Sequence, residues 1–238
     1  MLLFKLKNAA KPFSSRSLFH TTSKSFDLFS FNLNKYRSLI NVKGPDASSF
    51  LQSLITNDIK RLSWPNNPIQ FAMILNSRGR VLFDVLIYNL NQPSNHVKSK
   101  SATHEDPNYM LEVDYEYRER ALKLLRLFKV KKQIEIRDVD DGEYEHVAIW
   151  SSEKAETEER AKVREERKEF FILHDDPRWI QLGQRFLAKR CDQVESSLEQ
   201  VKQVDRRAYK KHLYSCGVPE NNDDYKFENC IPLEYNLV

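Results

Sequence analysis

Between residues 34 and 140, the hydrophobic side chains follow two kinds of spacing: every second position in some stretches, and every third or fourth position in others. Alternation of apolar and polar side chains indicates strands, and apolar side chains three and four positions apart indicate helices. In chain order they predict a strand at 38–44, a helix that begins at Pro45, two strands around the turn 76–79 within 70–90, a strand at 109–113, a helix at about 114–128 and a strand at 133–139. The order β-α-β-β-(β)-α-β is the ferredoxin-like sequence of elements.

A second module is predicted for residues 141–238. Apolar runs indicate strands at 145–150, 170–173 and 179–188, and two mainly polar stretches indicate helices at about 192–202 and 204–215. Residues 151–169 combine helix formers and opposed charges with almost no apolar stripe, which predicts a solvent-exposed helical insertion. A docking helix is the alternative, but it would need a hydrophobic face. The fold class is therefore predicted to be α+β, with two modules.

The first 33 residues differ in composition from the rest. They hold five Lys or Arg residues against one acid, Asp27, and they are rich in Ser and Thr. This pattern favours an amphipathic organelle transit peptide over a secretory signal, whose apolar core would be interrupted by Lys5, Lys7 and Lys11. An ordinary basic tail is the alternative. We expect import into mitochondria.

Residues 34–238 hold 33 basic and 33 acidic side chains, so their formal charges cancel. A neutral body gives no electrostatic reason to expect a nucleic-acid partner. No run approaches the roughly 18 apolar residues of a membrane span, and we expect no membrane partner. The five Gly cannot form a phosphate-binding loop, the three Cys are widely spaced, and the six His are scattered. No metal site and no catalytic residue are predicted.

Asp84 and Arg80 are the first candidates for a binding site. Strand alternation places both on the same face as Leu82, while Val81, Phe83 and Val85 form the opposite, core face. Asp84 therefore either lines a cleft or pairs with Arg80.

Three other polar side chains stand beside apolar runs. Glu234 lies inside the run IPLEYNL and either faces solvent or binds a positively polarised ligand. Asn57 belongs to the group Thr-Asn-Asp that closes the first predicted helix, where capping and turn formation are the simpler explanation. Asn76 begins the hairpin turn.

Five separated blocks occur in the order and spacing of a known family: RSLINVKGPDASSFLQSLITND, FAMILNSRGRVLFDVLIY, DPRWIQLGQRFL, YKKHLYSCGVPE and IPLEYNLV. From about residue 35 to the end, the chain resembles the mitochondrial iron-sulphur cluster assembly factors related to the glycine-cleavage T protein, a folate-dependent aminomethyltransferase. The resemblance implies a role late in the maturation of 4Fe-4S proteins in the mitochondrial matrix. It also implies iron-sulphur carrier proteins and apo 4Fe-4S enzymes as partners, and we expect a monomer.

The resemblance further implies the aminomethyltransferase-like folate-binding fold, with tetrahydrofolate as cofactor. Asp84 resembles an acid of the folate cleft, and Glu234 resembles the glutamate that contacts the pterin ring, whose N–H groups suit a carboxylate acceptor. Asn57, Asn76 and Arg80 are predicted to complete this cofactor site. The alternatives are a folate-dependent one-carbon transferase and a non-catalytic scaffold or inactive isoform.

The sequence departs from the family at its end. In the family, the block that contains PLE-x-NL continues into a K-G-C-x-G-Q-E signature and a C-terminal barrel, but this sequence ends at Val238. Cys191, Cys216 and Cys230 do not match that signature. We therefore expect a truncated chain without the C-terminal barrel and with weak activity or none.

Overall fold

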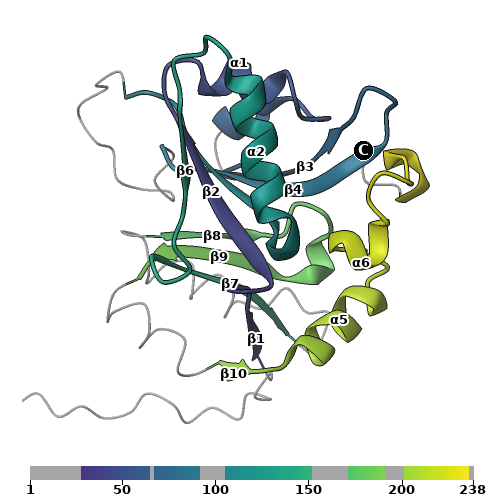
Figure 1. The fold of residues 1–238 in the computed structure, drawn as a ribbon. Helices are drawn as coiled ribbons and strands as arrows, with labels where there is room; N and C mark the ends of the chain where they lie inside the picture. Colours follow the sequence, from purple (N-terminus) through teal and green to yellow (C-terminus); the bar gives the residue numbers. More distant parts are fainter. Residues whose placement is uncertain (1–27, 65–66, 92–104, 152–170, 191–200, 236–238) are drawn as a thin grey trace, which may run out of the picture.

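The computed structural model describes residues 28–64, 67–91, 105–151, 171–190 and 201–235, which build two five-stranded sheets (Figure 1). In chain order the elements are β1 Leu28–Asn32, β2 Arg37–Lys43, α1 Ala47–Gln52, η1 Ile59–Ser63, β3 Ile69–Leu75, β4 Val81–Asn89, β5 Asn108–Asp114, η2 Tyr115–Tyr117, α2 Arg118–Lys129, β6 Glu135–Asp138, β7 Tyr144–Ser151, β8 Phe171–Asp175, η3 Ile180–Leu182, β9 Gln184–Lys189, β10 Lys202–Gln203, α5 Arg206–Ser215, α6 Asn221–Tyr225 and η4 Pro232–Tyr235. Elements labelled η are 3₁₀ turns. None of the helices in this part of the chain could span a bilayer.

The first sheet has the strand order β3-β4-β5-β2-β6, and all its neighbouring strands are antiparallel. The sequence of elements is the predicted ferredoxin-like one, with β3 placed at the sheet edge beside β4. The first helix is shorter than predicted, because it ends at Gln52. Asp58 instead begins the turn η1, where its side chain accepts a hydrogen bond from the Lys60 amide.

The second sheet has the order β10-β1-β7-β9-β8. Its strand β1 was not predicted, because Leu28–Asn32 lies in the part of the sequence assigned to a leader; it pairs antiparallel with β7. The run predicted as one strand at 179–188 begins as the turn η3, and Gly183 at φ 89° separates that turn from β9. The predicted insertion at 151–169, the predicted helix at 192–202 and the leader before residue 28 fall almost entirely outside the described residues.

The two sheets and their helices form successive layers (Figure 1). Helices α1 and α2 cover one face of the first sheet, and their buried side chains join its core. Ile172 of β8 and Leu187 of β9 belong to the same core cluster, so the second sheet packs near the first. Helix α5 packs on the second sheet through Tyr209 and Leu213, and α6 lies against β4 and β5. All nine residues of β4 are buried as a result.

Candidate functional site

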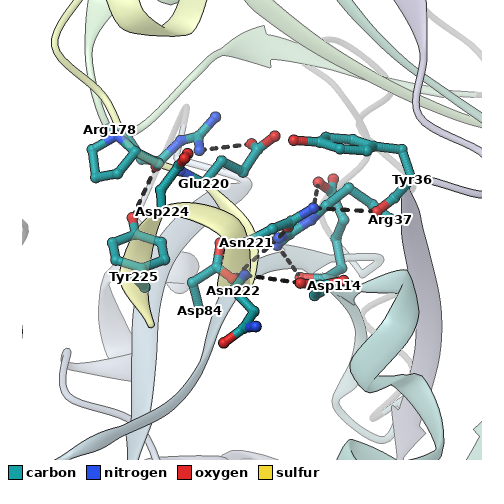
Figure 2. Close-up of polar contacts among 12 residues, drawn as sticks. Tyr36, Arg37, Asp84, Asp114, Arg178, Glu220, Asn221, Asn222, Asp224 and Tyr225 are labelled. Carbon is teal, nitrogen blue, oxygen red and sulfur yellow. Dashed lines mark hydrogen bonds and ion pairs between the residues drawn. The ribbon is translucent and has the colours of Figure 1, made fainter. Parts of the chain in front are cut away.

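Arg37, the first residue of β2, lies at the centre of a set of buried charges. Its Nη1 donates to both oxygens of Asp84, at 3.1 and 3.0 Å, and its Nε donates to Glu112 Oε1 at 3.1 Å. Strand register explains this meeting: residue 37 pairs with Asp114, two positions from Glu112 on the same face of β5. Nη1 also donates to the side chain of Asn221, as Figure 2 shows.

Arg185 of β9 reaches the same place from the second sheet. Its Nη1 donates to Glu112 Oε1 at 3.1 Å, so this one oxygen accepts from an arginine of each sheet. Its Nη2 donates to Glu220 Oε1 at 2.8 Å and its Nε to Asp176 Oδ2 at 2.8 Å. Glu112 therefore joins the two sheets through charge-assisted hydrogen bonds.

The chain segments before η3 and α6 complete the set. Arg178 binds Asp176 through Nε at 2.9 Å and Nη2 at 2.8 Å, and its Nη1 donates to Glu220 Oε1 at 2.7 Å (Figure 2). Tyr209 of α5 donates to Glu220 as well. We use the name buried ionic network for seven residues: Arg37, Arg178, Arg185, Asp84, Glu112, Asp176 and Glu220.

The four carboxyl groups of the network differ in proton affinity. Burial alone would raise the pKa of each, but the guanidiniums of Arg178, Arg185 and Arg37 outweigh it at Glu220 and lower its pKa to about 2. Arginine pairs likewise hold the pKa values of Asp176 and Glu112 below their ordinary values. At Asp84 burial prevails over the charge of Arg37, and the pKa is raised. Asp84 is thus the carboxyl group of the network that most readily holds a proton.

His146 of β7 borders this network and carries no charge near neutral pH. It is 3% exposed, and burial lowers its pKa to about 4, although the nearby Glu112 carboxylate opposes that shift. Among the described residues, no group of three or more His, Cys, Asp or Glu side chains is arranged to hold a metal ion.

A small cavity opens where β2, η2, α5 and α6 meet. Its volume is about 60 Å³, and its lining residues are Lys35, Tyr36, Asp114, Tyr115, Glu116, Arg206, Asn221 and Asp223. A space of this volume has room for water molecules. Ligand pockets for cofactor-sized molecules are about 300 Å³ or more.

The structure separates Asp84 from the other predicted site residues. Asp84 is fully buried and pairs with Arg37, not with Arg80, which corrects that alternative. The reason is that β4 begins at Val81: Arg80 lies in the turn, where its Nη1 donates to the Asn229 carbonyl at 2.7 Å. The face of β4 that carries Asp84 does not line an open cleft, because the second sheet and α6 cover it.

The three other predicted residues serve local structure. Asn76 accepts hydrogen bonds from the Arg78 and Arg80 amides and so closes the hairpin turn. Asn57 donates to the Phe71 carbonyl at 2.6 Å. Glu234 is exposed and accepts from the Ile231 amide at 2.9 Å within its own turn. Among the described residues, no hydrogen bond or ion pair joins any of these three to Asp84.

The described arrangement does not fit tetrahydrofolate at Asp84. Both carboxylate oxygens of Asp84 are bonded to Arg37, and its side chain is fully buried. A pterin could reach Asp84 only if the Arg37–Asp84 pair opened and α6 moved.

The sequence contains a signal for the network residues that were not singled out. Glu112 and Arg185 interrupt the apolar runs YMLEV and QRFLA, and a buried strand with one charged side chain requires a buried partner. What the sequence does not give is the pairing, because Arg37 and Arg185 are 75 and 73 positions from Glu112.

Comparison with known families and solved structures indicates the class of the protein. A family model described as the GCVT N-terminal domain matches residues 31–141. The fold is similar to that of the glycine cleavage system aminomethyltransferase T from Bartonella henselae, with a TM-score of 0.57 and 15% identity, over 81% of this chain and 52% of that one. The class is thus the aminomethyltransferase T fold, which is folate-related.

Curated relatives narrow the class to one branch. The chain is 30% identical to the mitochondrial iron-sulfur cluster assembly factor IBA57 homolog of Dictyostelium discoideum, over 85% of the chain and 52% of that protein. It is 28% identical to the IBA57 proteins of Mus musculus and Homo sapiens, over 85% and 84% of the chain and 54% of each relative. Together these similarities support an IBA57-like protein of the GCVT superfamily. It spans about half the length of the curated relatives it matches.

Proposed function

We propose that this chain acts in iron-sulphur cluster assembly in mitochondria, in the maturation of 4Fe-4S proteins. The observation that carries the proposal is the similarity to mitochondrial assembly factors, which extends over 84–87% of the chain in three fungal, two animal and one amoebal relatives among others.

The location and partners follow from the same proposal. The relatives are named mitochondrial, and the basic, Ser- and Thr-rich leader agrees with import into the matrix. The partners would then be iron-sulphur carrier proteins of the matrix and the apo forms of 4Fe-4S enzymes. The boundaries of the two sequence-predicted modules, 34–140 and 141–238, and the monomeric state remain part of this proposal.

Complementation of cells depleted of their own assembly factor tests the function. Aconitase, a 4Fe-4S enzyme, is assayed after expression of the 238-residue chain, of a full-length mouse relative, or of neither, with a cluster-independent matrix enzyme as reference. We expect the chain to restore aconitase activity above the level of cells that express neither protein. No recovery, at a matrix level equal to that of the relative, would contradict the proposal.

We further propose that the role in cluster assembly depends on tetrahydrofolate, and the same assay tests this separately. Recovery is measured with and without folate depletion, for the original chain and for Asp84→Asn. If the Arg37–Asp84 pair opens, α6 moves and folate then binds at Asp84, folate depletion and the substitution each reduce recovery, and their effects do not add. If recovery needs neither folate nor the Asp84 carboxyl group, the folate part is wrong and the assembly role stands.

A further inference from the structure

The end of helix α2 and the segment after it form a basic surface within a chain body whose charges cancel overall. From residue 120 to residue 134 the sequence holds six Lys or Arg residues and no Asp or Glu. We use the name α2 tip for a set of nine side chains: Lys123, Leu124, Arg126, Leu127, Phe128, Lys129, Val130, Lys131 and Lys132. Helix α2 lies on the outer side of the first sheet (Figure 1).

Large apolar side chains are exposed among these cations. Leu127 is 72% exposed, Phe128 52% and Val130 80%. They are not needed to attach the helix, because Leu122 and Leu125 already bury its opposite side in the core. The tip therefore presents apolar groups to solvent beyond those that fold the helix onto the sheet.

The cations of the tip remain available to a partner. Within the described part of the chain, neither Lys123, Arg126, Lys129 nor Lys131 forms an ion pair, and Lys132 donates to the hydroxyl group of Ser49 at 3.2 Å. The neighbouring carboxylate of Asp46 accepts from the Gln133 amide at 2.8 Å.

Val130, directly after the last residue of α2, has an unusual backbone conformation. Val130 has φ 42° and ψ −113°, a conformation that is costly for a β-branched residue. Burial of its side chain cannot offset this cost in the chain as it stands, because the residue is 80% exposed.

We propose that the α2 tip binds the surface of an anionic membrane. A single-sign cluster of cations matches a uniformly negative surface, and each Lys or Arg close to an anionic bilayer strengthens binding roughly fivefold. Leu, Phe and Val at the same level would enter the boundary between headgroups and acyl chains. An acidic protein is the less fitting partner, because stable protein interfaces use about 20–30 residues a side and the tip has nine. The binding is peripheral, and the proposal does not depend on the role in cluster assembly.

Sedimentation of the full chain with vesicles tests the proposal. One vesicle preparation is phosphatidylcholine alone, and the other also contains phosphatidylglycerol. We expect binding to the anionic vesicles only, and roughly 25-fold weaker binding for Lys129→Gln/Lys131→Gln, which lacks two cations. Arg207→Gln/Lys211→Gln is the matched control: both residues are exposed on α5, and the loss of their charges should change binding less than twofold.

A local probe separates the tip from the basic leader, which every variant retains. In Leu127→Trp, the added indole should shift to shorter emission wavelengths on anionic vesicles, after subtraction of the spectrum of the original chain. A bound chain whose added indole stays unshifted would be held through another surface, and the proposal would be overturned. Equal losses in the two double variants would overturn it too. So would absent vesicle binding combined with loss of a soluble partner by Lys129→Gln/Lys131→Gln, which would assign the tip to a protein.

Discussion

Single carboxyl groups of the buried ionic network make the stability of the fold depend on pH. In the folded chain, burial opposes ionisation of Glu220, but three arginines prevail and hold its pKa at about 2, below its ordinary 4.5. Between these values the unfolded chain binds more protons than the folded one, so stability falls as pH falls through this window. The stabilisation is complete above about pH 4.5 and is lost towards pH 2.

We predict that Glu220→Gln flattens this dependence. The variant should be less stable than the original chain by about 3–5 kcal/mol at pH 7, because three arginines lose a buried carboxylate. Urea midpoints measured from pH 7 to pH 3 should therefore converge for the two chains as the pH falls.

Asp84→Asn is the matched contrast to Glu220→Gln. Its carboxyl group has a raised pKa, so Asp84 weakens the original chain as pH rises above 3.8, and Asp84→Asn should lack that decline. Parallel pH curves for the original chain and Glu220→Gln would exclude this account.

The sequence allows part of this site to be predicted. Asp84 stands out as an acid inside an apolar strand, and it does lie at the centre of the polar core. Its partner could not be chosen, because Arg80 is close in sequence whereas Arg37 is 47 positions away and becomes adjacent only through the sheet. Glu234, which a family resemblance suggested, shows no distinguishing feature of burial or pairing.

Helices, strands and turns whose conformation depends on neighbouring residues can be predicted from the sequence. The hairpin of β3 and β4 is set by alternation and by Asn76, whose side chain closes the turn. The predicted strand at 179–188 is wrong at its start, because the conformation there is fixed by a contact distant in sequence. A Cβ atom on Gly183 would lie 2.2 Å from the Ile149 carbonyl oxygen of β7.

Gly183→Ala should consequently displace η3 from β7. The substitution combines that collision with a φ of 89°, which L-residues with a Cβ rarely adopt. We expect a loss of about 2–4 kcal/mol in the free energy of unfolding, measured by urea denaturation. Gly142→Ala is the control, since nothing lies within 4 Å of its added Cβ and its φ is not in the left-handed region; it should stay within about 0.5 kcal/mol. Equal effects would mean that close approach to β7 is not what requires Gly183.

The net charge of the whole sequence does not show where the charged side chains lie in the folded molecule. The acids and bases after residue 33 are equal in number, yet every charged side chain of the α2 tip is basic and the side chains of the network are buried. Sheet membership is likewise not local, since β1 precedes the first sheet in sequence but pairs with β7 of the second. Such placements depend on which distant segments pack together, and one sequence without related sequences carries no direct record of that packing.

Arg185 connects the two sheets, so its removal should affect both. It pairs with Glu112 of the first sheet and with Asp176 and Glu220 outside it, and Arg185→Met would leave these carboxylates with fewer counter-charges. We expect a loss of about 3–5 kcal/mol in stability. Hydrogen exchange should report reduced protection of β4 and β5 together with β7 and β9, because the sheets unfold as one unit when Glu112 joins them. Arg190→Gln removes a partly exposed pair with Glu145 and serves as the control, with an effect below about 1 kcal/mol. If Arg185→Met lowered protection in β7 and β9 alone, the network would be stabilising one sheet and the two sheets would be independent.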